Sequence, residues 1–240
     1  CLLSPETIER ISQLIVGEGQ RLVPEAVTTT RADSFVVETC IHYPTESSLI
    51  HDGLRKVIEL AVPQAEAFGV DGWRQHSHLL KRVKKAAREV GRIASRQGKN
   101  YQSRLKKSYE ELLSLARKIT SRAQDLFDLI TLKKMSVSTR AADMKVFLDR
   151  TRQVMDTARR RVIEGETVPN SDKLFSIFEP HTQLHKRGKA GEPVQFGRLV
   201  MVYEDGAGFI THHHLLPRDA SDRDVIIAQT KAVQERLGCL

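Results

Sequence analysis

The segments of this chain that favour β-strands lie far apart, and this separation limits the folds that the chain can adopt. Val27 to Ile41 is rich in Val, Thr, Phe and Ile, residues that suit a pleated, half-buried backbone. Val194 to Glu204 and Gly208 to Leu216 flank an Asp-Gly pair, which predicts a hairpin. More than 150 residues separate the first strand from this hairpin. We expect all three strands to share one sheet, with Ile41 and Val194 on neighbouring strands or their continuations, so that the intervening residues form an insertion.

The insertion has a helical pattern. Its apolar residues recur at spacings of three and four in three stripes, and each stripe must be buried against another. The stripes run from Leu79 to Ala94, from Leu105 to Ile130 and from Ala141 to Val162. A shorter leading helix, Leu54 to Leu60, is expected to end before Pro63. The sequence therefore predicts a helical bundle from about Leu49 to Glu164.

A last helix is predicted after the hairpin. Asp219, Ser221 or Asp222 is expected to cap it. It should run through Arg236 and stop at Gly238.

Charge is distributed unevenly along the chain. Residues 71–165 hold 24 Lys and Arg against 10 Asp and Glu, and the rest of the 240-residue chain holds 14 against 20. Clustered cations release counterions from phosphates, so we expect this segment to bind double-stranded DNA. Solvated helix faces are the alternative, and a membrane surface is a weaker one because Trp73 has few large apolar companions. The predicted DNA-binding residues are Lys81, Arg82, Lys84, Lys85, Arg88, Arg92, Lys106, Lys107, Arg159, Arg160 and Arg161.

Asp33 is the exception within the first predicted strand, because a carboxylate there must be solvated, paired or bound to a cation. Taken alone, it is most simply a partly exposed surface residue, as aspartates usually are. His42-Tyr43-Pro44 should end the strand. Ser47 or Ser48 is then expected to cap a helix that opens at Leu49.

The segment from Asp33 to Gly53 resembles one that carries the first catalytic aspartate in bacterial insertion-sequence transposases of the DDE type, the ISNCY-like group. That family's pattern runs roughly V-D-T-T-V-V-E-T-N-I-H-Y-P-T-D-S-S-L-L-W-D-G. The shared residues are Asp33, Val36, Val37, Glu38, Thr39, Ile41, His42, Tyr43, Pro44, Thr45, Ser47, Ser48, Leu49, Asp52 and Gly53. A second block, Ser176 to Asp222, resembles the family's F-E-P-H-T, K-G-K-x-x-x-P-V-x-F-G and N-P-x-D segments, with Ala220 where the family usually has Pro. Together with the helical part between them, the two blocks cover Asp33 to Leu240.

The resemblance implies a metal-dependent mechanism. DDE transposases hold two divalent ions with three carboxylates, and the ions activate the attacking hydroxyl and stabilise the leaving oxygen. Oxygen ligands suit Mg²⁺ or Mn²⁺. Asp33 matches the first carboxylate, as both catalytic and metal-binding residue. The second and third would lie beyond Leu240, so we expect an internal fragment that cleaves no DNA by itself.

The resemblance also implies the setting of the intact protein. It would transpose DNA by strand cleavage and strand transfer, acting on element ends and target in the bacterial cytoplasm at the nucleoid. A homo-oligomer is left open. The fold implied is α+β, a partial ribonuclease-H-like mixed sheet interrupted by an inserted helical bundle. The expected divisions are an N-terminal helical segment (1–24), the first core strand and turn (25–48), the basic bundle (49–165) and the hairpin with its following helix (166–240).

Two other functions stay open: a non-catalytic DNA-binding relic or regulatory protein derived from a transposase, and a structural helical module with a solvated basic face. Should the chain cleave DNA alone, Asp205, Asp219 and Asp222 would be the alternative metal ligands.

Some further residues invite a functional interpretation. Consecutive residues His212 to His214 alternate between the faces of a strand, which argues against a metal site. Glu38 should face away from Asp33 and orient the turn through His42 or a backbone amide. The basic loop Lys186-Arg187-Gly188-Lys189 could contact phosphates.

Overall fold

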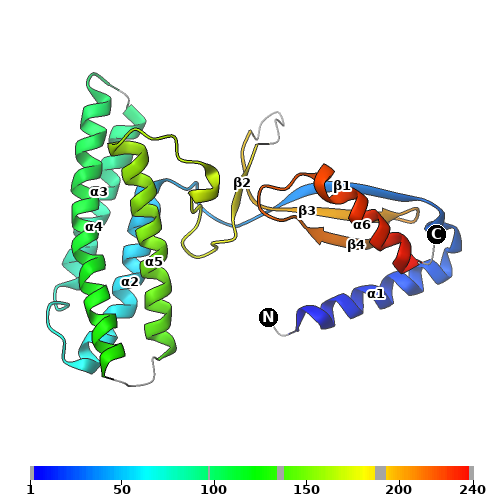
Figure 1. The fold of residues 1–240 in the computed structure, drawn as a ribbon, viewed down its shortest axis with the longest axis horizontal. Helices are drawn as coiled ribbons and strands as arrows, with labels where there is room; N and C mark the ends of the chain where they lie inside the picture. The colour runs from blue at the N-terminus through cyan, green and yellow to red at the C-terminus, as the bar shows by residue number, and fades with distance from the viewer. Residues whose placement is uncertain (1–2, 97, 134–137, 187–192, 238–240) are drawn as a thin grey trace. The chain divides into compact units, whose positions relative to one another are not determined.

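The computed structural model describes residues 3–96, 98–133, 138–186 and 193–237 (Figure 1). The chain forms two compact units, one of Cys1–Thr39 with Gln183–Leu240 and the other of Cys40–Thr182. The first unit holds an antiparallel sheet and the second a helical bundle, so the fold class is α+β. None of the helices in the described ranges combines the length and apolar character that a bilayer crossing requires.

Strand β3 (Gln195–Asp205) is the centre of the sheet. One of its edges pairs with β1 (Thr30–Glu38), from Thr30 opposite Asp205 to Glu38 opposite Gly197. Its other edge pairs with β4 (Ile210–Leu215) and with the short β2 (Gln183–His185). The first predicted strand and the hairpin therefore share one sheet across the insertion, as expected. The described strands are all antiparallel, and the mixed sheet that we expected is not seen among them.

The ends of β1 differ from the sequence prediction for local reasons. Pro24–Thr28 forms a 3-10 turn, η1, so the strand starts at Thr30 and not at Val27. At the other end the Thr39 amide donates to the Phe196 carbonyl at 2.9 Å, which continues the contact with β3 past Glu38.

The hairpin between β3 and β4 depends on Asp205. Its Oδ1 accepts hydrogen bonds from the amides of Ala207 and Phe209, both at 3.0 Å. Gly208 adopts a φ of 90°, which favours glycine. Because Asp205 is buried and hydrogen-bonded in this way, it is a structural residue of the turn.

One face of the sheet is covered by α6 (Asp222–Leu237). Met201 and Tyr203 of β3 are buried together with Val233 of the helix. The Tyr203 hydroxyl lies 3.0 Å from the Thr230 hydroxyl. At the start of the helix the Ser221 amide donates to Asp224 at 2.7 Å, which favours Ser221 among the three predicted caps. Gly238, the predicted stop, lies outside the described residues.

Helix α1 (Pro5–Leu22) lies beside β4 in the same unit. Its Ser4 cap accepts the Thr7 amide, and Pro5 occupies the first turn, where prolines are tolerated. Gly19 packs directly against the Phe209 ring, which leaves no room for a side chain. Gln20 donates to Asp205 at 3.1 Å, so α1 is tied to the hairpin turn.

The second unit is built from α2 (Glu46–Phe68), α3 (His76–Arg96), α4 (Tyr101–Leu132) and α5 (Thr139–Ala158). A π-helical turn, η2 (Arg159–Ile163), continues α5, and the 3-10 turn η3 (Asn170–Asp172) follows. The predicted apolar stripes face one another in a single core. Its fully buried side chains include Ile50, Leu54, Ile58, Leu112, Leu113, Leu126, Ile130, Met144 and Leu148.

Helix α2 departs from the prediction at both ends. It begins after Thr45, and the Thr45 hydroxyl and Ser48 form a reciprocal capping box, so neither Ser47 nor Ser48 is the cap. It also continues through Pro63 to Phe68. A proline inside a helix removes one backbone hydrogen bond, but the burial of Ala61, Gln64 and Ala65 around it stabilises the helical path.

Candidate carboxylate site and nucleic-acid interface

Asp33 lies near the middle of β1, opposite Val202 of β3. Its side chain is exposed, whereas those of its strand neighbours Ser34 and Val36 are buried. Because side chains alternate along a strand, Asp33 stands on the face of the sheet opposite to the one that α6 covers. Its Oδ1 accepts a hydrogen bond from the Ser34 amide at 2.8 Å.

The face that carries Asp33 is open and has a patch of apolar side chains, which lies among Arg31, Arg198, Glu204 and His213. Phe35 and Val37 of β1 are 45% and 49% exposed, and Leu215 of β4 is 47% exposed. The register places Val202 and Val200 of β3 between them on the same face. Apolar exposure of this kind marks a surface suited to a partner. Here it borders a carboxylate, Asp33, whose other strand neighbour on this face is Arg31.

The other carboxylates considered do not converge on Asp33. Asp222 accepts a hydrogen bond from the Ser34 hydroxyl at 2.7 Å, on the face that α6 covers. Asp205 is held in the hairpin turn, and Asp219 precedes α6 with a φ of 64°. Within the described ranges no group of three His, Cys, Asp or Glu side chains could hold a metal ion. Asp33 has the oxygen donors that Mg²⁺ prefers, but one carboxylate is too few to fix an ion.

Glu38 and the histidines of β4 have different hydrogen-bond partners. Glu38 accepts a hydrogen bond from Gln195 at 3.1 Å, so its partner is neither His42 nor the backbone amide that we expected. His212 lies 3.0 Å from Gln229 of α6, and the register places His213 on the opposite face. This agrees with the predicted alternation. In the basic loop, Arg187 to Lys189 lies outside the described residues.

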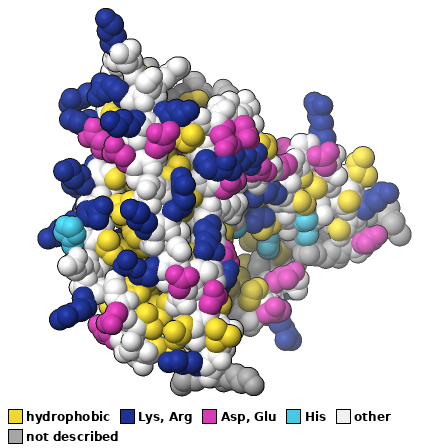
Figure 2. All heavy atoms as spheres, turned by 60° about the vertical axis from the view of Figure 1, so that its left-hand side comes forward, with side chains coloured by type: hydrophobic (Ala, Val, Ile, Leu, Met, Phe, Trp, Pro, Cys, Tyr) yellow, Lys and Arg dark blue, Asp and Glu magenta, His cyan; other side chains and the backbone are white. Residues whose placement is uncertain are grey.

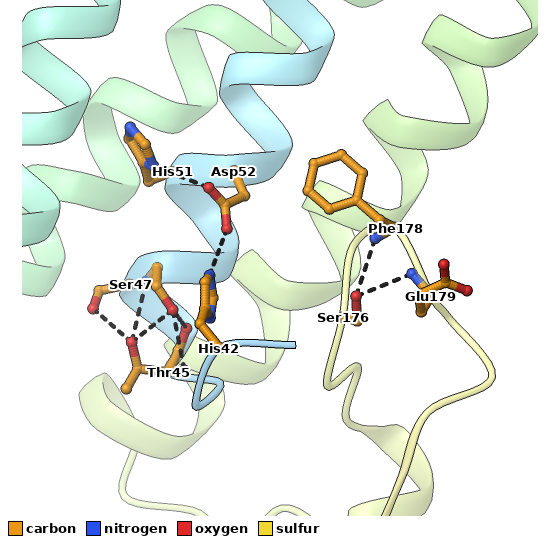
Figure 3. A network of polar contacts seen from close by, with 9 residues as sticks. His42, Thr45, Ser47, His51, Asp52, Ser176, Phe178 and Glu179 are labelled. Carbon is orange, nitrogen blue, oxygen red and sulfur yellow. Dashed lines mark hydrogen bonds and ion pairs between the residues drawn. The ribbon is translucent and has the colours of Figure 1, made fainter. Parts of the chain in front are cut away.

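His42 and Asp52 connect the turn after β1 to helix α2 (Figure 3). His42 Nε2 lies 2.9 Å from Asp52 Oδ2, and His51 Nδ1 lies 3.2 Å from Asp52 Oδ1. The hydrogen bond to Asp52 raises the pKa of His42 above its usual value. Burial opposes ionisation of Asp52, but its hydrogen bonds with His51 and His42 lower its pKa overall. Sequence reasoning missed this cluster, because His42 lies before the helix that carries His51 and Asp52, and no regular spacing links it to them.

A second polar turn lies in the Phe-Glu-Pro-His-Thr segment of the same unit (Figure 3). The Ser176 hydroxyl accepts the amides of Phe178 and Glu179 at 3.3 and 3.0 Å. The Phe178 ring lies 5.8 Å from the Phe147 ring of α5. Arg150 of α5 donates to the Ile177 carbonyl at 2.8 Å. Phe178 and the preceding Ile177 thus hold this segment against α5.

Helix α3 has the most basic surface of the bundle helices, with seven Lys and Arg against one Glu. Lys81, Lys84, Lys85, Arg88 and Arg92 fall within a narrow arc of the helix, opposite its buried residues Val83, Val90 and Ile93. All five are exposed, and Figure 2 shows Lys and Arg side chains spread over the bundle. We call these five residues, together with Arg82, the α3 basic stripe. Its one described ion pair joins Arg92 to Glu89 at 2.7 Å.

The remaining predicted DNA-binding residues lie in two other places. Lys106 and Lys107 are exposed near the start of α4. Arg159, Arg160 and Arg161 lie on η2, and each pairs with carboxylates of its own unit. Their partners are Asp156 and Glu164, Glu166 and Asp172, and Glu46, respectively. These three arginines therefore stabilise the end of the bundle, a role that their clustering in the sequence did not reveal.

Comparison of the chain with protein-family models, with curated proteins and with solved structures gives no match.

Proposed function

We propose that this chain is the part of a DDE transposase that carries the first catalytic aspartate and a DNA-binding insertion. One observation carries the proposal. The strand that carries the exposed carboxylate Asp33 pairs along its whole length with β3, although residues 40–182 intervene. The chain therefore leaves the sheet after β1, forms the helical unit, and returns to the sheet to pair β3 with β1. The Asp33 to Gly53 resemblance supports the same assignment.

The topology supports a ribonuclease-H-like core as the finer fold. Three antiparallel strands in the order β1–β3–β4 are followed by a helix on one face. In a core of this kind the next strand would run beside β1. Among the described strands β3 alone pairs with β1, which is consistent with that expectation.

The chemistry proposed for Asp33 is metal binding. Divalent ions in such sites activate a hydroxyl and stabilise a leaving oxygen at the scissile phosphate. The Ser34 amide holds Asp33 Oδ1 and fixes the orientation of the carboxylate on the open face. Since the described residues provide one such ligand, the remaining two carboxylates are proposed to lie in sequence that follows residue 240.

A chain extended through those carboxylates tests this proposal. We expect Asp33→Ala to abolish Mg²⁺-dependent cleavage of element ends while DNA binding is kept, because Asp33 would serve the ions and not bind the phosphates. Glu25→Ala, which removes one exposed carboxylate elsewhere in the same unit, is the control and should leave cleavage intact. Metal-dependent nicking by the 240-residue chain that Asp33→Ala abolishes would show that the other ligands have been misplaced.

A DNA-binding protein without catalysis is the second candidate, and the α3 basic stripe favours it. Five of its six cations have no ion pair within the described ranges, so they are available to phosphates. The two candidates share DNA binding. Cleavage by the extended chain would distinguish them.

A further inference from the structure

A cavity of about 390 Å³ lies within the helical unit, between the start of α2, the end of α3, the start of α4 and the end of α5. Its apolar lining includes Leu49, Val90 and Leu105. Tyr43 and Tyr101 also line it, and Tyr43 is 74% exposed. This volume is at the small end of the range for small-ligand pockets. It has room for one nucleotide and none for a duplex.

Polar groups meet on one side of this cavity. Arg161 donates two hydrogen bonds to Glu46, from Nε at 2.5 Å and from a terminal nitrogen at 2.7 Å. The π-helical turn η2 carries Arg161, and such turns are frequent at functional sites. Tyr109 is 3% exposed beside this pair, and burial raises the pKa of its phenol. Glu46 accepts from two of the five N–H donors of the Arg161 guanidinium. The donors of Arg161 and the acceptor oxygens of Glu46 therefore lie next to each other.

Gly91 is an independent sign that something approaches this cavity. It lies inside helix α3, where glycine is less favourable than alanine. A side chain at Gly91 would meet nothing within 4 Å, so packing within the protein does not require the glycine. Gly91 lines the cavity. Glycine is typical where a backbone comes close to a ligand.

We propose that this cavity receives a single nucleobase. Glu46 neutralises Arg161, and a flat neutral ring with both donors and acceptors matches the paired side chains. Lys173, which also lines the cavity, suits the phosphate of the same nucleotide. Apolar walls and aromatic rings are how proteins hold a base that has left its stack. The base would come either from bound DNA, as an unpaired base, or from a free nucleotide. The first of these sources rests on the proposed function.

The test uses the full 240-residue chain and the fluorescent base 2-aminopurine. Three probes are compared: a 20-base-pair duplex with 2-aminopurine in a one-base bulge, the same duplex fully paired, and free 2-aminopurine nucleotide. Gly91→Leu fills the cavity, whereas the matched control Gly91→Ala adds one methyl group. Circular dichroism verifies that both variants fold. Tyr43→Ala is a further variant, since a ring this exposed contributes little to the core.

We expect the bulged duplex to bind at least about tenfold more tightly than the paired one, with fluorescence quenched by stacking. Gly91→Leu should remove this preference and the quenching without changing affinity for the paired duplex, and Gly91→Ala, which adds one methyl group, should reduce both by less. Gly91-dependent quenching of the free nucleotide alone would assign the cavity to free nucleotides. If neither probe responds to Gly91→Leu, the proposal is overturned. Failure of the unmodified chain to bind the paired duplex would instead count against the proposed function.

Discussion

At the scale of single residues, the segment from His42 to Gly53 shows how side chains that hold a turn and a helix in place can define a sequence motif. Asp52 ties the turn to α2 through His42, and Thr45 caps the helix. Gly53 lies against Thr151 of α5 so closely that a Cβ would overlap the threonine hydroxyl. The sequence predicted the turn and a nearby cap from residue types. It could not predict the Gly53–Thr151 contact, because nearly a hundred residues separate the partners.

The His42–Asp52 pair predicts a pH-dependent stability. The pKa of His42 is raised in the folded state from a reference of 6.5, so its contribution is full below that pH and is lost as pH rises through the folded pKa. The pKa of Asp52 is lowered from 3.8, so its contribution is lost as pH falls through the folded pKa. In urea titrations, the wild-type chain should lose about 0.2–1 kcal/mol between mildly acidic and mildly alkaline pH, the range for partly exposed pairs. Asp52→Asn should flatten this dependence, and an equally steep profile would contradict the assignment.

Two identical substitutions should have opposite effects on stability. Gly53→Ala should lower the free energy of unfolding by about 1–3 kcal/mol, because the added methyl overpacks against buried Thr151. Gly91→Ala should raise it by about 0.5–1 kcal/mol, since its Cβ meets open space in a helix interior. Chemical denaturation measures both. Thr151→Ala combined with Gly53→Ala should recover part of the loss, and failure to do so would mean that the clash lies elsewhere.

At the scale of elements, periodicity predicted the three main helices of the bundle because each buries one apolar stripe in a common core. It failed where tertiary contacts override local rules. Pro63 was taken as a helix end, yet α2 continues because its surroundings are buried. The run Arg159-Arg160-Arg161, which is predicted to bind DNA, also forms ion pairs with carboxylates of its own unit, and the partner of Arg161, Glu46, lies 115 residues away. DNA binding by these three arginines stays a prediction.

The α3 basic stripe predicts that the residues that bind DNA lie mainly on helix α3. Changing Lys84, Lys85 and Arg88 together to Glu should weaken duplex binding. It should also reduce the slope of log affinity against log salt by about 0.9 for each phosphate that the protein no longer neutralises. Changing Arg10, Arg223 and Lys231 to Glu alters the net charge equally at exposed positions of the other unit and should have little effect. Equal weakening by both triple variants in gel-shift titrations would mean that net charge alone governs binding.

At the scale of the whole molecule, the sequence predicted that strands separated by the insertion would meet, because neither the first strand nor the hairpin is a stable sheet alone. The pairing of β1 with β3 agrees with this. The short β2, on the opposite edge of β3, was not predicted, since three residues carry almost no periodic signal. Likewise, the open face around Asp33 follows from which side of the sheet α6 covers. A strand pattern by itself cannot specify that side.

Because β1 and β2 both pair with β3, we predict that the sheet unit folds without its insertion. Glu38 and Gln183 both lie opposite Gly197, on the two edges of β3. Adjacent strands are about 4.8 Å apart, so the two residues are roughly 10 Å apart. A linker of about six glycine and serine residues can span that distance in place of Cys40–Thr182. The shortened chain should show strand and helix signals by circular dichroism and a cooperative thermal transition.

The same dissection locates DNA binding. Residues 40–182 expressed alone should bind duplex DNA with the salt dependence of the full chain, because they contain the α3 basic stripe, and the shortened chain should bind weakly. Duplex binding that stays with the shortened chain would refute the assignment to α3. A shortened chain that fails to fold, beside an isolated bundle that folds, would show that the sheet depends on its insertion. The two units would then be one cooperative structure, because the bundle would contribute to the stability of the strands that it separates.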